Sequence, residues 1–129
     1  MAFLGQRGST NGIPNMLFRD GMTFSPDITF EAYVYVIGGG GSGGAVGTAI
    51  SNNYAASGGG AGGCAVSRLI LTANQNYVIT IGAGGNYAGG AGVSDGNDGT
   101  NTTFVNSGES VSITGNGGAG GNQSSHGAG

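Results

Sequence analysis

The sequence predicts an all-β fold: a small antiparallel β-sandwich or barrel-like sheet with long glycine-rich loops at one end and an irregular N-terminal arm. Five short runs are rich in β-branched and aromatic residues. Glycine supplies 32 of the 129 residues and is concentrated between and after those runs. No window of about 11 residues spaces its apolar side chains as an amphipathic helix does. We therefore expect almost no helix.

The arm is expected over residues 1–29. This segment mixes apolar and turn residues without a sustained period, and it allows at most one helical turn, over residues 16–20. An apolar arm of this kind is normally held against another surface. Its candidate docking residues are the large apolar side chains Phe3, Leu4, Leu17, Phe18 and Phe24.

The expected strands cover residues 29–37, 64–72, 77–81, 101–105 and 110–114. The last three alternate apolar and polar side chains, as strands with one buried face do. The first two are almost continuously apolar, which predicts strands covered on both faces. Together these runs form a glycine-rich β domain over residues 30–121. Residues 122–129 form a polar and glycine-rich tail.

The glycine-rich connections are expected to gather at one end of the sheet. If the five runs pair as antiparallel neighbours, residues 38–63, 82–99 and 115–129 all leave from the same end. Two short turns and the arm then lie at the other end. The expected glycine conformation is polyproline II, which has no internal hydrogen bonds. Its N–H and C=O groups must pair with neighbouring segments, and oligomerisation is a second expected source of contacts.

Composition and charge exclude several classes of function. The chain has three arginines and no lysine, too few to neutralise nucleic-acid phosphates, so we expect no nucleic-acid binding. No apolar run reaches the roughly 18–20 residues of a membrane span, so no membrane insertion is expected. The first residues lack the pattern of a secretory signal. A single cysteine makes no internal disulfide.

We expect no catalytic residue, no cofactor and no metal site, and therefore no enzyme. Residues 38–43 match the spacing of a dinucleotide-binding loop, but no helix is expected after them. No acidic residue that would bind a ribose lies between Glu31 and Asp95. Cys64 and His126 have no orienting acid nearby and are too few to hold zinc.

Residues 95–99 (DGNDG) look like part of a calcium-binding loop. The later positions of an EF-hand loop are not filled by the required ligands. The ordinary interpretation is a turn rich in Asp, Asn and Gly, and a single surface Ca²⁺ stays open as an alternative.

Tyr54 and Tyr87 stand alone within glycine-rich loops. Aromatic side chains among small residues are favoured contacts for receptors, sugars or neighbouring subunits. They also serve as anchors between glycine segments. Both interpretations remain open, and the two tyrosines are the candidate surface contacts.

The order of these motifs is similar to that of a known family. GGGGSGG, SGGGAGG, LTANQNYVITIGAGG, DGTNTTF and SITGNGGAGG follow one another within residues 30–121. This series resembles the glycine-rich domains of bacteriophage tail and tail-fibre proteins. The resemblance implies a structural or receptor-facing element of the virion, often a trimer. The chain is much shorter than a tail fibre, so a capsid-decoration protein, a head fibre or a small tail-tip subunit also fits.

We therefore expect a non-enzymatic structural protein of a bacteriophage virion that acts by assembly. The expected partners are copies of itself, as a homotrimer, and major capsid or tail proteins, with a host cell-surface receptor as a further partner of the exposed loops. One alternative is an adhesin tip that recognises a host glycan or outer-membrane protein. Another is an ice-binding or cell-wall glycine-rich protein, for which regular Gly-x-x repeats are expected.

Overall fold

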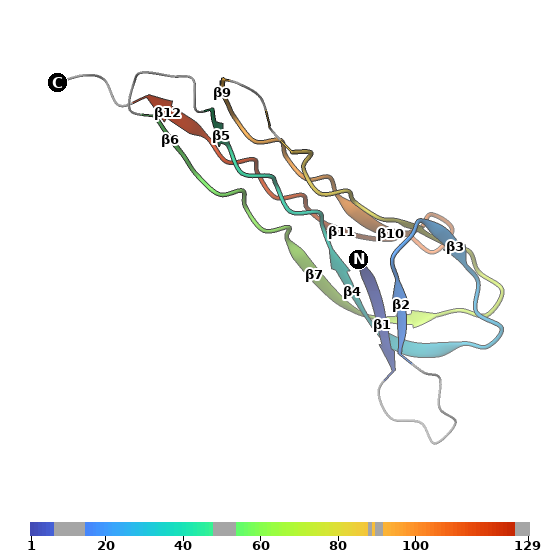
Figure 1. The fold of residues 1–129 in the computed structure, drawn as a ribbon. Helices are drawn as coiled ribbons and strands as arrows, with labels where there is room; N and C mark the ends of the chain where they lie inside the picture. The colour runs from blue at the N-terminus through green and yellow to red at the C-terminus, as the bar shows by residue number, and fades with distance from the viewer. Residues whose placement is uncertain (7–14, 48–53, 88, 90–91, 126–129) are drawn as a thin grey trace.

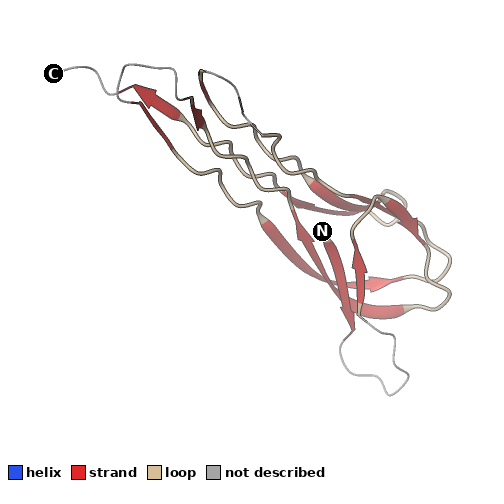
Figure 2. Cartoon of the chain, viewed as in Figure 1, coloured by secondary structure: helices blue, strands red, loops and turns tan. Residues whose placement is uncertain are grey.

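The computed structural model describes residues 1–6, 15–47, 54–87, 89 and 92–125. Within these ranges the chain is all-β and contains no helix, which confirms the predicted fold class (Figure 2). Figure 1 shows two parts: a β-sandwich and a bundle of long loops that runs away from it.

The sandwich consists of two four-stranded sheets in which every pairing is antiparallel. Sheet A has the order β2-β1-β4-β7 and sheet B the order β11-β10-β8-β3. The strands of sheet A are β1 (Ala2–Gln6), β2 (Met16–Phe18), β4 (Phe30–Ile37) and β7 (Cys64–Leu71). The strands of sheet B are β3 (Met22–Phe24), β8 (Tyr77–Thr80), β10 (Thr102–Asn106) and β11 (Val111–Gly115).

All five strands expected from the sequence are present, and their ends differ from the expected ends by one residue at most. The N-terminal segment departs from the expectation, because its described residues form β1, β2 and β3 instead of an irregular arm. The helical turn allowed over residues 16–20 is also absent, since β2 lies there. The strands β2 and β3 have three residues each and are too short to show a period. They form because longer strands offer them backbone partners: β2 pairs with β1, which itself pairs along β4, and β3 pairs along β8.

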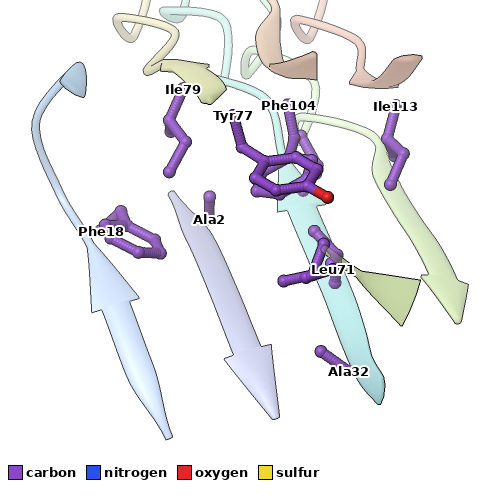
Figure 3. Close-up of a cluster of buried hydrophobic side chains, with 10 residues drawn as sticks. Ala2, Phe18, Ala32, Leu71, Tyr77, Ile79, Phe104 and Ile113 are labelled. Carbon is purple, nitrogen blue, oxygen red and sulfur yellow. The ribbon is translucent and has the colours of Figure 1, made fainter. Parts of the chain in front are cut away.

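The hydrophobic core lies between the two sheets. Figure 3 shows side chains of sheet B pointing toward those of sheet A. Sheet A contributes Ala2, Phe18, Ala32, Val34, Val36 and Leu71, and sheet B contributes Tyr77, Ile79, Phe104 and Ile113. The rings of Tyr77 and Phe104 stack with centroids 5.3 Å apart. Alternation along each strand therefore places one set of side chains in the core, as the sequence predicts for β8, β10 and β11.

A polar contact closes the core at the end with the short turns. The buried Tyr77 hydroxyl donates to the Glu109 carboxylate at 2.5 Å and accepts from the Thr72 N–H at 2.8 Å. Burial, followed by the bond to Glu109, raises the pKa of Tyr77. Hydrogen bonds from Thr72 and then Tyr77 lower the pKa of Glu109. The contact thus favours a neutral phenol and an ionised carboxylate.

Within the part of the chain that the structure describes, the outer face of sheet A is left exposed, whereas β4 and β7 are expected to be covered on both faces. Along β7, exposed residues alternate with more buried ones, and Val66 and Ile70 are 53% and 66% exposed. Between them Arg68 donates two hydrogen bonds to Glu31 of β4, at 2.5 and 2.8 Å. A continuous apolar run therefore does not imply two covered faces within a single chain.

Candidate functional site

The most distinctive feature is the set of glycine-rich segments beyond the sandwich, which we call the glycine bundle. Figure 1 shows these segments side by side, all leaving from the same end of the sandwich, as the sequence predicts. In chain order, the first to fifth segments are residues 38–44, 57–63, 82–87, 95–101 and 116–122. The first, third and fifth segments follow β4, β8 and β11. The second and fourth segments precede β7 and β10.

Hydrogen bonds between the segments repeat every three residues. The N–H groups of Gly38, Gly41 and Gly44 donate to carbonyls of the second segment at 2.8–3.0 Å. The next row, Gly39 and Ser42, donates to carbonyls of the fourth segment at 2.9–3.0 Å. No glycine of the five segments has a φ in the left-handed region. Lateral bonds with a three-residue period are those expected of polyproline II segments packed together.

The positions of glycine follow from how many neighbours each segment has. The first segment is central and contacts the other four. A Cβ added at Gly38, Gly39 or Gly41 would lie 2.0 Å from a backbone oxygen of another segment. The fourth segment has fewer enclosed positions, and its only glycines are Gly96 and Gly99, where a Cβ would lie 2.1 Å from the first segment. Glycine is thus required where a residue faces another backbone.

Side chains of the fourth segment satisfy one row of amides in the fifth segment and at the start of β12. The side-chain oxygens of Asp95, Asp98 and Asn101 each accept from a backbone N–H of residues 117–123, at 2.7–2.9 Å. Residues 95–99 therefore form an extended segment and not the expected turn. No group of three or more potential metal ligands occurs among the residues that the structure describes. In this structure the two carboxylates act as acceptors for backbone amides.

Two short strand pairs occupy the far end of the bundle (Figure 1). They are β5 (Ala45–Val46) with β9 (Val93–Ser94), and β6 (Tyr54–Ala56) with β12 (Gln123–Ser125). We call this end the tip. Tyr54 is half-buried in β6, whereas Tyr87 is 88% exposed at the end of the third segment. Tyr87 therefore does not pack as an anchor between segments. A role of either tyrosine in binding a partner stays a prediction.

The candidate docking residues are spread over the sandwich. Phe18 belongs to the buried core, Phe24 is half-buried in β3, and Leu17 is exposed on the outer face of sheet A. Phe3 and Leu4 lie on β1, where their backbones pair with β2 and β4. A docking function for these residues stays a prediction, although Phe18 contributes to the core.

An open groove of about 330 Å³ lies beside the N-terminal strands. Its lining is mainly apolar: Met16, Phe24, Ser25, Pro26, Asp27, Ile28 and Phe30. The carbonyl of Pro26 accepts from Asn74 in the turn between β7 and β8. The groove therefore lies near the end of the sandwich that is opposite the glycine bundle.

The remaining motifs do not assemble into a site. Residues 38–43, which match a dinucleotide-binding spacing, lie in the centre of the glycine bundle and are followed by β5 instead of a helix. Cys64 is exposed at the start of β7, and His126 lies outside the described residues. Within the described chain, no helix is long and apolar enough to cross a membrane.

Comparison with known proteins identifies the family of the chain. A family model described as a glycine-rich domain matches residues 21–129, which covers most of the chain and the whole glycine bundle. No curated protein and no solved structure matches the chain.

Proposed function

Because the chain belongs to the family of glycine-rich domains, we propose that its glycine bundle is a rigid projecting element and that the protein is a structural component of a bacteriophage virion. The proposal combines two supports. One is the order of motifs, which resembles that of phage tail proteins. The other, which carries most weight, is the bundle itself: five segments bonded laterally along their length project from a packed sandwich. Such an element displays a tip at a fixed distance from its base.

The outer face of sheet A supports a role in assembly. Leu17, Val66 and Ile70 are exposed large apolar residues on this face, at 46%, 53% and 66%. Covering apolar surface stabilises an interface by roughly 25 cal/mol per Å². We propose that this face contacts other copies of the chain, as a trimer, or a major capsid or tail protein, and that the tip points outward.

The first experiment measures the mass of the purified chain in solution by sedimentation equilibrium. A homotrimer has three times the monomer mass of 12.4 kDa. Val66→Glu should convert it to a folded monomer, because the charge would be buried in the interface. Tyr87→Ala, at the tip, is the matched control and should leave the mass unchanged. A wild-type monomer would contradict the trimer.

The location is tested separately by labelling purified phage particles with an antibody against the chain and imaging them by electron microscopy. Labelling at regular positions on the particle supports a virion component. Particles that lack the chain would contradict the proposal.

The exposed Tyr87 favours one second function, an adhesin tip that binds a host glycan or outer-membrane protein. Tyr87→Ala should then reduce adsorption to cells while particles still assemble with normal amounts of the chain. Unchanged adsorption would favour the purely structural role. Thermal hysteresis of the purified chain tests the ice-binding alternative.

A further inference from the structure

The first glycine segment has one side that no other segment covers. Because its bonds repeat every three residues, its N–H groups fall into three rows. The row of Gly38, Gly41 and Gly44 donates to the second segment, and the row of Gly39 and Ser42 donates to the fourth. The third row consists of the remaining residues of the segment.

This third row starts in the sandwich. The N–H of Ile37, the last residue of β4, donates to the Met1 carbonyl at 2.8 Å, and the Met1 nitrogen donates to the Ile37 carbonyl at 2.9 Å. The row therefore faces the position that β1 occupies beside β4. Its next members are Gly40 and Gly43, three and six residues further along. Both are exposed, and neither N–H has a hydrogen-bond partner among the described residues.

The third segment lies beside this row. The Gly85 N–H donates to the Gly40 carbonyl at 2.8 Å. Gly84 is exposed, and a Cβ built there would lie 3.5 Å from the same carbonyl, an ordinary contact. The open side of the first segment is thus a strip of bare backbone bordered by the third segment. It continues the position of β1 beyond Met1.

We propose that this open side binds an extended glycine-rich segment of a partner protein, which becomes a sixth member of the bundle. The partner segment adopts polyproline II and runs antiparallel to the first segment, as β1 does to β4. Two of its carbonyls, three residues apart, accept from Gly40 and Gly43. The binding resembles strand addition to a sheet edge, with main-chain bonds as the source of affinity. It does not depend on the proposed virion role.

The geometry also specifies the composition of the partner segment. In the existing bundle, positions that face another backbone are glycine, because a Cβ there would lie about 2 Å from a carbonyl oxygen. The partner therefore requires glycine at least at every third position, where it faces the first segment. Positions that face solvent tolerate side chains, as Ala61 and Ala83 do in the bundle.

The test uses an acetylated and amidated peptide of residues 57–63 repeated twice, because that segment already bonds antiparallel to the first segment. It is added at millimolar concentration to the ¹⁵N-labelled full chain. Hydrogen exchange at Gly40 and Gly43 should slow about tenfold, and their amide resonances should shift. Gly41 and Ser42, which are already bonded, should not change. A peptide with alanine in place of every glycine is the control, because none of its three rows is then free of Cβ atoms.

A second arm compensates for weak binding of a free peptide. The same sequence is fused directly before Met1, where it would enter the open side at a high effective concentration. The antiparallel register then predicts bonds from Gly40 and Gly43 to the third and sixth residues before Met1.

Two variants locate the binding surface. Gly84→Leu should remove the protection, because its side chain extends over the open side. Ala83→Leu is the matched control, since residue 83 is exposed on a different row and should leave the protection intact. Circular dichroism verifies that both variants are folded.

Protection in either arm that Gly84→Leu removes supports the proposal. It is overturned if neither arm protects the two amides, if the alanine peptide protects them equally, or if Gly84→Leu has no effect.

Discussion

The sandwich and the glycine bundle pack their chain segments together in opposite ways. In the sandwich, side chains such as Phe104 and Tyr77 fill the space between two sheets and exclude water. In the bundle, the backbones approach so closely that a single added carbon would collide with a neighbouring oxygen. Both parts pair their backbone N–H and C=O groups, one with a strand ladder and the other with lateral bonds every three residues. Both parts are therefore held together by extensive pairing of the main chain, whereas a side-chain core is only one way to achieve compactness.

The largest expected effect tests whether the side-chain core holds the sandwich together. Phe104→Ala removes a fully buried ring stacked on Tyr77 and should lower the free energy of unfolding by about 3–5 kcal/mol. The measurement is denaturant unfolding followed by circular dichroism. Val78→Ala, on the exposed face of the same sheet, should cost less than about 1 kcal/mol. Equal losses would show that the core does not hold the sandwich together.

The backbone half is tested by two adjacent glycines of the second segment. Gly59→Ala places a Cβ 2.2 Å from the Gly41 carbonyl oxygen and should destabilise the bundle by about 1–3 kcal/mol. Gly58→Ala meets nothing within 4 Å and should change stability by less than about 1 kcal/mol, in the stabilising direction. Hydrogen exchange of the bundle amides measures both. The same cost at the two positions would contradict the conclusion that glycine is required only where a residue faces another backbone.

A smaller effect is expected where a side chain replaces a backbone acceptor. Asp98→Ala leaves the Gly120 N–H without its 2.7 Å acceptor and should cost about 0.5–1.5 kcal/mol. Asp98→Asn keeps an oxygen at the same place and should recover most of the loss. Thermal unfolding of the two variants provides the measurement, and identical melting temperatures would mean that the bond contributes nothing.

The smallest effect concerns pH and the sandwich alone. Glu109 has a lowered pKa in the folded state, so its contribution is present above its ordinary value of 4.5 and is lost as the pH falls below it. Tyr77 has a raised pKa, so its contribution is present below 10.0 and is lost as the pH rises above that value. The unfolding midpoint measured across this range should decline at both ends. Glu109→Gln should flatten the acidic decline, and an unchanged profile would contradict the role of this contact.

Much of the fold could be predicted because β8, β10 and β11 carry period-2 patterns and β4 and β7 are long apolar runs rich in β-branched and aromatic residues. Antiparallel pairing of these five strands then places every glycine-rich connection at the same end. The short strands β2 and β3 could not be predicted, since three residues show no period, and the partner of β3 lies more than fifty residues further along the chain. The acceptor row of Asp95, Asp98 and Asn101 was also missed. Its signal in the sequence is the spacing of three between these side chains, which matches a polyproline II repeat and not a turn.

The three-residue repeat of the bundle has a consequence for how its length can vary. One added triplet per segment, with glycine in the same rows, preserves every lateral contact type and moves the tip outward by about 9 Å, since each residue of this conformation rises roughly 3.1 Å. No residue of the sandwich has to change. The distance from the sandwich to the tip therefore changes in steps of one triplet. The bundle can be lengthened or shortened in such steps without changes in the sandwich.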